Sequence, residues 1–347
     1  MDGSRKNASR DFVAYNIRRG AGIDGLARTT RTSAALGPHD VRVRMRAVAL
    51  NYRDLMVVRG ESGMPGVDFV PASDGAGEVV EVGSAVTRFH AGDRVIGAFF
   101  PDWHDGTQEP TKVVRALGGT ADGVLAEEVV MDENAWAAMP ANLDFVEAAT
   151  IPCAAVTAWH ALFGLDPLKP GDSVLLLGTG GVSTWALQLA KAAGLRVVIT
   201  SSDDAKLDRA AALGADATIN YRRTPEWQDE ALRATGGRGV DRVLDIGGPE
   251  TLPRSITATR SGGTIAVIGR LTGTAGVAID PAALFLGNKR LAGVLVGSRA
   301  MTEDVVRFVE RAGVRPVIDR LFDFADTREA YAYLGDAQHF GKVVIRV

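Results

Sequence analysis

The chain has 347 residues, more than one hydrophobic core usually holds, which predicts two domains. Its 39 basic and 42 acidic residues nearly balance, so a net charge of −3 gives no electrostatic reason to expect nucleic acid or an anionic membrane as partner. The single cysteine, Cys153, excludes an internal disulfide and any cysteine-rich zinc site, and it is typical of a reducing compartment.

The N-terminal part of the chain predicts β-structure. Its first residues are polar and lack the apolar core of a signal peptide, so we expect a cytoplasmic protein. Three β-rich segments follow, and glycine-containing turns rather than helical patterns separate them: 41–50, 76–83 and 93–99. This pattern favours a partly open, mostly antiparallel β-domain.

Residues 148–165 contain no Asp, Glu, Lys or Arg, which raises the question of a membrane span. The segment is rich in Ala and Thr, contains Pro152 and His160, and barely reaches spanning length. A buried helix is therefore favoured.

The middle of the chain alternates short apolar runs with helical patterns. The helical patterns 183–193 and 204–213 each end at a glycine, Gly194 and Gly214. Such alternation predicts βαβ units and a doubly wound, six-stranded parallel sheet. The predicted strands are 174–177, 197–200, 217–220, 242–246, 264–268 and 291–296.

The last part of the chain mixes a helical pattern at 302–313 with an apolar strand at 342–347. Because chain termini often lie close together, we expect these elements to complete the first domain.

A glycine-rich turn joins the first of the parallel strands to its helix. Gly178 suits the tight turn, and Gly180 lets the backbone approach a pyrophosphate that faces the helix N-terminus. Thr179 and Gly181 complete the turn, and Ser183 stands where a third glycine is usual. The position between a strand and a helix predicts a dinucleotide-binding site.

The end of the second parallel strand bears on the choice of dinucleotide. A 2′-phosphate suits the hydroxyls of Ser201 and Ser202 and the ammonium of Lys206, which lie at this end. Tyr221, after the next strand, could close over the same phosphate. Asp203 and Asp204 favour the alternative, a carboxylate on the ribose of NADH. We expect NADPH.

Several segments in order resemble the medium-chain dehydrogenase/reductase superfamily, in its zinc-independent, quinone oxidoreductase-like branch. The resemblance implies a GroES-like domain from residues 1–147 and 297–347 around a Rossmann domain at 148–296, with the active site in the cleft. Homodimers are common in this family, and residues 284–297 are a candidate edge for pairing. The segments are 51-NYRDLMVVRG-60, 71-PASDGAGEVVEVGSAVTRFHAGDRV-95, 151-IPCAAVTAWHAL-162, 178-GTGGVS-183, 212-ALGADATINY-221 and 341-GKVVI-345.

Zinc enzymes of the same superfamily hold their catalytic metal on three residues, and the matching positions here are Asn51, Ser73 and Cys153. One thiolate cannot hold a tetrahedral zinc, so we expect no metal, with Cys153 a small buried residue in the substrate cleft. His104 and His160 have no spacing that supports a replacement ligand set.

Without zinc, a carbonyl must be polarised by hydrogen-bond donors, which suits hydride addition to a quinone or an α,β-unsaturated carbonyl. The resemblance places Asn51, Tyr52 and Asp54 in the cleft. Tyr52 is either a substrate-stacking or donor residue or a packing aromatic. The alternatives for the whole protein are a metal-free alcohol dehydrogenase or carbonyl reductase, and a non-catalytic NADPH-binding protein.

The remaining expected contacts concern cofactor and substrate. By resemblance, Thr157 and Val182 contact the nicotinamide, and Lys342 either reaches the cofactor or is a salt-bridged surface lysine. Phe99 and Trp103 either form an aromatic rim over the substrate or anchor their own loop. The ends of the fourth and fifth parallel strands, at the ligand-binding edge of such a sheet, add three cofactor residues: Gly247, Ile268 and Gly269.

Overall fold

The computed structural model describes residues 10–18, 20–33, 35–61 and 68–347. By compactness, the chain divides into one unit of Met1–Cys153 with Gly297–Val347 and a second unit of Ala154–Val296. The sequence-based division at 147/148 and 296/297 remains a prediction, and each unit is described separately below.

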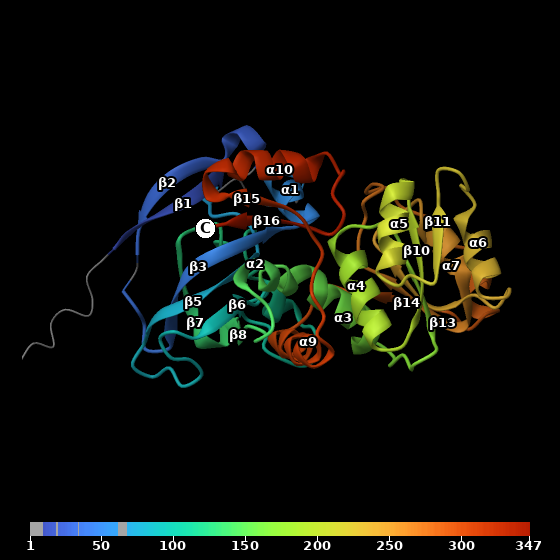
Figure 1. Ribbon diagram of the computed structural model, residues 1–347, viewed down its shortest axis with the longest axis horizontal. Coiled ribbons are helices and arrows are strands. Elements are labelled where there is room, and N and C mark those ends of the chain that lie inside the picture. The colour runs from blue at the N-terminus through green and yellow to red at the C-terminus, as the bar shows by residue number, and fades with distance from the viewer. Residues whose placement is uncertain (1–9, 19, 34, 62–67) are drawn as a thin grey trace, which may run out of the picture. The chain divides into compact units, whose positions relative to one another are not determined.

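The main sheet of the first unit has the strand order β15-β16-β3-β5-β6-β8, and β7 pairs with β3 (Figure 1). Every pairing is antiparallel except that of β15 with β16, which confirms the mostly antiparallel domain. The strands are β3 (Asp40–Leu50), β5 (Asp74–Val82), β6 (Arg94–Gly97), β7 (Glu128–Asp132), β8 (Trp136–Ala138), β15 (Ile318–Asp323) and β16 (Lys342–Arg346).

The register of this sheet brings three distant segments to one edge. Val343 of β16 lies opposite Leu50 of β3, and Ala49 of β3 lies opposite Asp74 of β5. Because both neighbours run antiparallel to β3, the end of β3 meets the start of β5 and the start of β16. The C-terminal strand thus completes the first unit, as expected.

A smaller sheet, in the order β2-β1-β4, and four α-helices make up the rest of the regular α/β structure among the described residues of the first unit. The helix α1 corrects the expectation that no helix interrupts the N-terminal strands. It forms because the Asp54 side chain accepts the N–H of Asn51 at its start, while Leu55, Val57 and Val58 are buried. The elements are β1 (Asp11–Arg18), β2 (Ala27–Thr32), β4 (Asp68–Phe69), α1 (Tyr52–Val58), α2 (Phe145–Ala148), α9 (Arg299–Ala312) and α10 (Thr327–Gly335).

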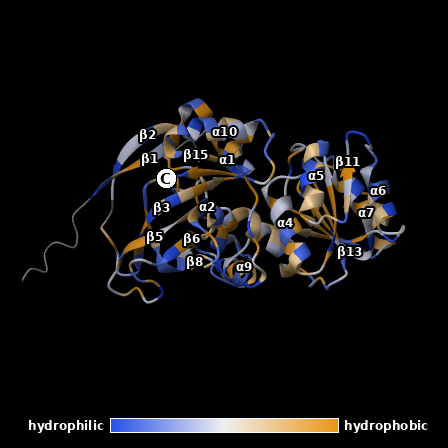
Figure 2. Ribbon diagram, in the orientation of Figure 1, coloured by the Kyte–Doolittle hydropathy of each residue, from blue (hydrophilic) through white to orange (hydrophobic). Residues whose placement is uncertain are grey.

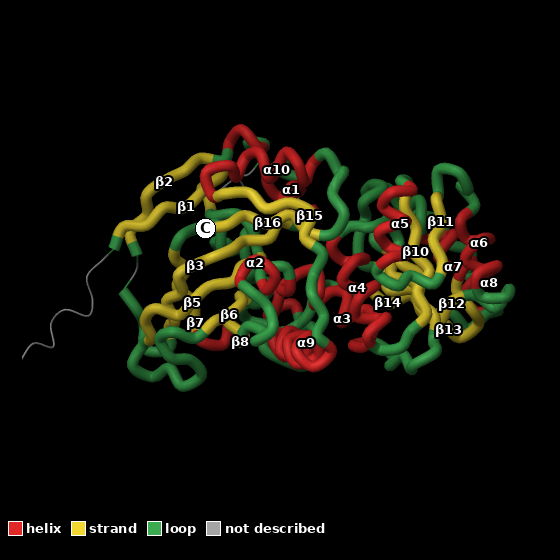
Figure 3. The backbone as a smooth tube through the Cα atoms, viewed as in Figure 1, coloured by secondary structure: helices red, strands yellow, loops and turns green. Residues whose placement is uncertain are grey.

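The second unit contains a six-stranded parallel sheet in the order β11-β10-β9-β12-β13-β14, which confirms the Rossmann prediction (Figure 3). Much of this sheet is orange, the colour of hydrophobic residues, in Figure 2. Its strands are β9 (Ser173–Leu176), β10 (Arg196–Ser201), β11 (Ala217–Asn220), β12 (Val240–Asp245), β13 (Thr259–Val267) and β14 (Arg290–Gly293). The accompanying helices are α4 (Gly181–Ala192), α5 (Asp204–Ala212), α6 (Trp227–Ala234), α7 (Leu252–Ala258) and α8 (Ala282–Phe285).

The charge-free segment after Ala148 is helical, as expected, but it is not a regular α-helix. Ile151–Ala155 and His160–Gly164 are wound as π-helix on either side of α3 (Val156–Trp159). Such wide turns often occur at functional sites. Within the residues that the structure describes, no helix combines the length and the apolar character needed to cross a bilayer.

Candidate functional site

Polar side chains of the first unit gather where β3 ends and β5 and β16 begin. The Nζ atom of Lys342 donates to the carbonyl of Leu50 at 2.7 Å and to Oδ1 of Asn51 at 2.5 Å. Only 2% of Lys342 is exposed, so the surface-lysine alternative is wrong. Its contact with a cofactor stays a prediction.

Asp74 connects this cluster to Cys153. Its Oδ1 accepts the hydroxyl hydrogen of Ser73 at 2.6 Å, and its Oδ2 accepts the backbone N–H of Cys153 at 2.9 Å. Burial raises the pKa of the Cys153 thiol, and the negative charge of Asp74 raises it further. Cys153 is therefore a neutral, partly buried thiol.

The three positions that hold zinc in relatives do not fit a divalent cation here. The Asn51 oxygen accepts an ammonium proton and Ser73 donates its proton to Asp74. Cys153 would supply a single thiolate, which alone cannot complete a tetrahedral zinc site. The fixed ammonium of Lys342, 4.0 Å from Oδ2 of Asp74, would also repel a metal ion. Across the described ranges, no three His, Cys, Asp or Glu side chains are arranged to hold a metal.

Asp54 lies behind Asn51 and is 1% exposed, whereas the neighbouring Tyr52 is 43% exposed. Oδ2 of Asp54 accepts the backbone N–H of Asn51 at 2.8 Å. Burial raises the pKa of Asp54 from 3.8 to about 6, opposed by the positive charge of Arg53, whose Nη1 atom lies 3.5 Å from Oδ1. Asp54 thus holds Asn51 in place, while Tyr52 is open to a ligand.

The expected aromatic rim is buried within the first unit. Trp103 is 1% exposed and donates its indole N–H to the carbonyl of Gly106 at 3.0 Å. Phe99 is also buried, and the guanidinium of Arg53 lies 4.8 Å from its ring centre. These contacts favour the loop-anchoring alternative, because an anchored and covered ring offers little surface to a substrate. Arg53, which the sequence analysis passed over, thus connects the Asn51–Asp54 motif to this loop.

In the second unit, the glycine-rich turn has the shape that a pyrophosphate requires. Gly178 has φ 73°, a left-handed conformation that favours glycine. Apart from Gly180 itself and its own chain neighbours, no atom of the described residues lies within 4 Å of where a Cβ would stand on Gly180, so its backbone is open to a close ligand. The Ser183 hydroxyl donates to the carbonyl of Leu177 at 2.7 Å and so ties α4 to the end of β9. Thr179, Gly181 and Val182 belong to this turn and to the start of α4.

At the end of β10, the two acidic residues that favoured NADH are already engaged. The Asp203 side chain accepts the backbone N–H of Lys206 at 3.1 Å and so caps α5. Asp204 forms an ion pair with Arg223 and accepts from the Asn220 amide at 2.8 Å. These contacts hold both carboxylates at the start of α5.

The hydroxyl-bearing residues of this region adjoin one another. Ser201 is buried and accepts the backbone N–H of Asp203 at 3.3 Å. The N–H of Tyr221 donates to the carbonyl of Ser201 at 3.1 Å, and the Tyr221 ring is 41% exposed. The ends of β10 and β11 therefore bring Ser201, Ser202 and Tyr221 to the same edge of the sheet.

The ends of β12 and β13 are organised by Asp245, which the sequence analysis did not single out. Its Oδ1 accepts the N–H groups of Gly247 and Gly248 at 3.0 and 2.9 Å, and its Oδ2 accepts the Ser255 hydroxyl at 2.6 Å. Its backbone carbonyl accepts the N–H of Ile268 at 2.8 Å. An acid at the end of a buried strand, two positions before a pair of glycines, is the signal that would have identified it.

Gly269 follows Ile268 and has no room for a side chain, because a Cβ there would stand 2.6 Å from the carbonyl oxygen of Ile246. Thr157, on α3, is 3% exposed. The Nδ1 of His160 lies 2.8 Å from the carbonyl oxygen of Val296, and burial lowers the pKa of this imidazole. His160 is therefore a neutral, structural histidine.

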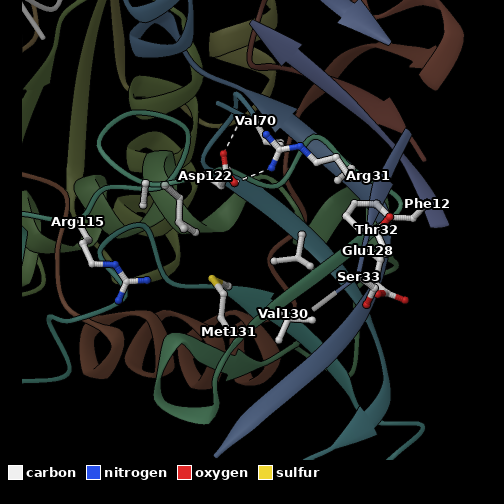
Figure 4. A pocket seen from close by; sticks show the side chains of 15 residues that line it. Phe12, Arg31, Thr32, Ser33, Val70, Arg115, Asp122, Glu128, Val130 and Met131 are labelled. Carbon is white, nitrogen blue, oxygen red and sulfur yellow. Dashed lines mark hydrogen bonds and ion pairs between the residues drawn. The ribbon is translucent and has the colours of Figure 1, made fainter. Parts of the chain in front are cut away.

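A separate cavity of about 240 Å³ lies in the first unit (Figure 4). Arg31 donates to Asp122 at 2.7 Å, and Asp122 also accepts the N–H of Val70 at 2.8 Å. Arg115 and Met131 line other parts of its wall. None of the site residues predicted from the sequence lines this cavity, so it is not the predicted substrate site.

Two family models match the chain: "Alcohol dehydrogenase GroES-like domain" at residues 37–141 and "Zinc-binding dehydrogenase" at residues 181–311. A zinc-type alcohol dehydrogenase-like protein of Schizosaccharomyces pombe is 43% identical over 318 residues, covering 90% of this chain and 92% of that protein.

Solved structures agree with this match. One from Sinorhizobium meliloti 1021, provisionally described as an alcohol dehydrogenase, has a TM-score of 0.90 and 42% identity, covering 98% of this chain and 100% of that one. An NAD-dependent alcohol dehydrogenase has a TM-score of 0.87 and 35% identity, covering 96% of this chain and 99% of that one.

Proposed function

Because the chain belongs to the medium-chain dehydrogenase/reductase family of oxidoreductases, we propose that it is an NADPH-dependent, metal-free reductase of conjugated acceptors. Its acceptor is a quinone or an α,β-unsaturated carbonyl. The observation that carries this proposal is the cluster of Asn51, Ser73, Asp74, Cys153 and Lys342, in which the Asn51 oxygen accepts from the Lys342 ammonium and the Ser73 hydroxyl donates to Asp74.

The poor fit of these residues to a metal ion favours conjugate reduction over alcohol oxidation. Oxidation of an alcohol is helped by a metal that acidifies the hydroxyl, which this cluster does not offer. Conjugate reduction requires only donors near the carbonyl oxygen, where negative charge develops. Bound NADPH would supply the hydride to the β carbon, and a proton would then reach the α carbon.

The residues of the first unit have separate roles in this proposal. Asn51 offers amide hydrogens to the acceptor's carbonyl oxygen. Tyr52, exposed at the first turn of α1, stacks on the flat acceptor or donates the proton, directly or through water. Asp54, buried behind them, holds the backbone of Asn51.

The residues of the second unit would hold the dinucleotide. The turn from Gly178 to Gly181 faces the pyrophosphate, and Ser201, Ser202 and Lys206 face the 2′-phosphate of NADPH. The engagement of Asp203 and Asp204 at α5 supports this choice. The name of the NAD-dependent relative favours NADH instead, so both cofactors belong in the assay.

An acceptor panel tests the function. The purified protein is assayed with NADPH and with NADH on enones, quinones, aldehydes and ketones, read by loss of absorbance of the reduced cofactor. Reduction of enones or quinones is expected. Reduction of aldehydes alone would favour the alcohol dehydrogenase or carbonyl reductase that the relatives' names suggest. Tight NADPH binding without turnover would favour a non-catalytic binding protein, and about one zinc per chain by elemental analysis would overturn the metal-free claim.

We also propose that the protein forms a homodimer through β14. This strand ends the sheet order, so one side of its backbone lacks a strand partner among the described residues. Large apolar side chains nearby are exposed: Phe285, Leu286, Leu291 and Leu295. Leu291→Glu should shift the mass measured by light scattering from dimer to monomer, whereas Val114→Glu, at an exposed residue of the first unit, should not.

A further inference from the structure

Four side chains of the first unit form a closed ring of polar contacts at the edge where β3 ends. Lys342 donates to Asn51 Oδ1 at 2.5 Å, and Asn51 Nδ2 lies 3.4 Å from the hydroxyl oxygen of Ser73. That hydroxyl donates to Asp74 at 2.6 Å, and Oδ2 of Asp74 lies 4.0 Å from the Lys342 ammonium. Three of the four residues are almost fully buried, and only Asn51 is partly exposed.

The chemistry of the ring determines which way each proton points. An ammonium is only a donor and a carboxylate only an acceptor, so Lys342 must face the oxygen of the Asn51 amide. The Ser73 hydroxyl gives its one hydrogen to Asp74, and its oxygen is left to accept from the Asn51 nitrogen. The amide therefore cannot flip without placing its NH₂ group against an ammonium.

This orientation leaves one amide hydrogen of Asn51 unused. The Asn51 nitrogen carries two hydrogens, one of which is directed to Ser73. The other has no acceptor within the described ranges of the chain. The backbone of Asn51 is held as well, since its N–H donates to Asp54 at 2.8 Å. The free hydrogen is thus a donor on a side chain fixed from two directions.

We infer that Lys342 is a positioning residue that orients and polarises the Asn51 amide, so that its second N–H donates to the carbonyl oxygen of the acceptor. This inference rests on the proposed function. It gives the buried Lys342 a role in orienting Asn51, whereas the sequence suggested a surface lysine or a cofactor contact. Lys342 contacts no substrate in this arrangement. Its donation to Oδ1 makes the amide nitrogen a stronger donor, because linked hydrogen bonds polarise one another.

A double-mutant cycle tests whether the contribution of Lys342 to turnover depends on Asn51. Lys342→Met, Asn51→Ala and the double variant are compared with the wild type for kcat and KM on a conjugated acceptor. Each single change should lower kcat by about 10-fold to 100-fold, the scale of one lost donor to a developing oxyanion. The double variant should fall no further than Asn51→Ala alone. Losses that multiply would overturn the inference, because they would show that Lys342 acts independently of Asn51.

Cofactor affinity separates this role from a cofactor contact. The Kd for NADPH, read by the fluorescence of the bound cofactor, should remain within about 3-fold in Lys342→Met. A large rise in this Kd would instead place Lys342 on the cofactor. Lys289→Met is the matched control, because Lys289 also donates to a backbone carbonyl, that of Ile256 at 2.6 Å, but lies in the second unit. It should leave kcat unchanged.

An absorbance measurement tests the same role of Lys342 without turnover. 4-(Dimethylamino)cinnamaldehyde absorbs at longer wavelength when its carbonyl oxygen accepts a hydrogen bond, and with NADP⁺ present it is not reduced. The wild type should shift this absorbance to the red, and both Lys342→Met and Asn51→Ala should abolish the shift. If the wild-type protein reduces no acceptor but still shifts the dye absorbance to the red, only the proposed function is refuted. If Lys342→Met keeps the red shift, the positioning role is refuted.

Lys342→Gln covers the case in which Lys342→Met does not fold. Glutamine keeps a donor for Asn51 without the charge, so it should retain most of the dye shift. Loss of the shift in a folded Lys342→Gln protein would mean that the ammonium charge near Asp74, rather than the orientation of Asn51, is what matters.

Discussion

Replacement of Asp54 by Asn removes a carboxyl group that the fold buries at a cost. The side chain is 1% exposed, and its pKa rises from 3.8 to about 6 because burial outweighs the nearby positive charge of Arg53. One pKa unit corresponds to about 1.4 kcal/mol, so ionised Asp54 costs the folded state about 3 kcal/mol. The amide of the variant is neutral and can still accept the N–H of Asn51.

The direction of the pKa change determines how Asp54 affects the free energy of unfolding at each pH. Below pH ~4 the carboxyl is neutral in both the folded and the unfolded chain, so the group has no effect on stability. Between pH ~4 and ~6 the unfolded chain loses its proton first, and the free energy of unfolding of the wild type falls. Above pH ~6 the full cost is present. The variant lacks this pH-dependent term, so its stability relative to the wild type should increase with pH.

Urea unfolding at a series of pH values measures the difference. From pH 4.5 to pH 7.5, the free energy of unfolding of Asp54→Asn relative to the wild type should increase by about 2 kcal/mol. Asp208→Asn, at an exposed position of α5, serves as the control and should change by less than about 0.5 kcal/mol. A flat difference for Asp54→Asn would refute the reasoning, because it would mean that Asp54 ionises as easily in the folded chain as in the unfolded one.

The remaining predictions concern the proposed chemistry. Tyr52→Phe should lower kcat with unchanged NADPH affinity, and an unchanged kcat would make Tyr52 a stacking residue only. Lys206→Ala should raise the Kd for NADPH about 10-fold with little effect on NADH, and an equal loss for both would refute the 2′-phosphate contact. Asp245→Ala frees the N–H groups of Gly247 and Gly248 and should lower the melting temperature by several degrees in a thermal scan.

Much of the Rossmann unit could be predicted because its signals are local. Each parallel strand is a short apolar run, each early helix ends at a glycine, and the turn at Gly178 lies between a strand and a helix. The strand order β11-β10-β9-β12-β13-β14 is one that suits the doubly wound fold predicted from this alternation. α1 was missed because its apolar residues also suit a strand, and only the contact between Asp54 and Asn51 marks its start.

The aromatic loop could not be assigned from the sequence. Phe99 and Trp103 suit an exposed rim as well as a buried anchor, and the choice depends on what covers them. The structure supplies the answer through the Arg53 guanidinium over Phe99 and the Trp103 indole bond to Gly106.

By itself, the sequence determined the parallel sheet and the dinucleotide turn, because residue types and short-range periodicity carry these features. The family resemblance, rather than any local pattern, placed Asn51 and Ser73 at two positions that hold zinc in other members. Only the tertiary structure decided which side chains contact Asn51 and Ser73. Lys342 and Asn51 are 291 positions apart in the chain, and no local pattern links them. The pairing of β16 with β3 brings them together, and burial at that edge turns an apparent surface lysine into the residue that directs the Asn51 amide.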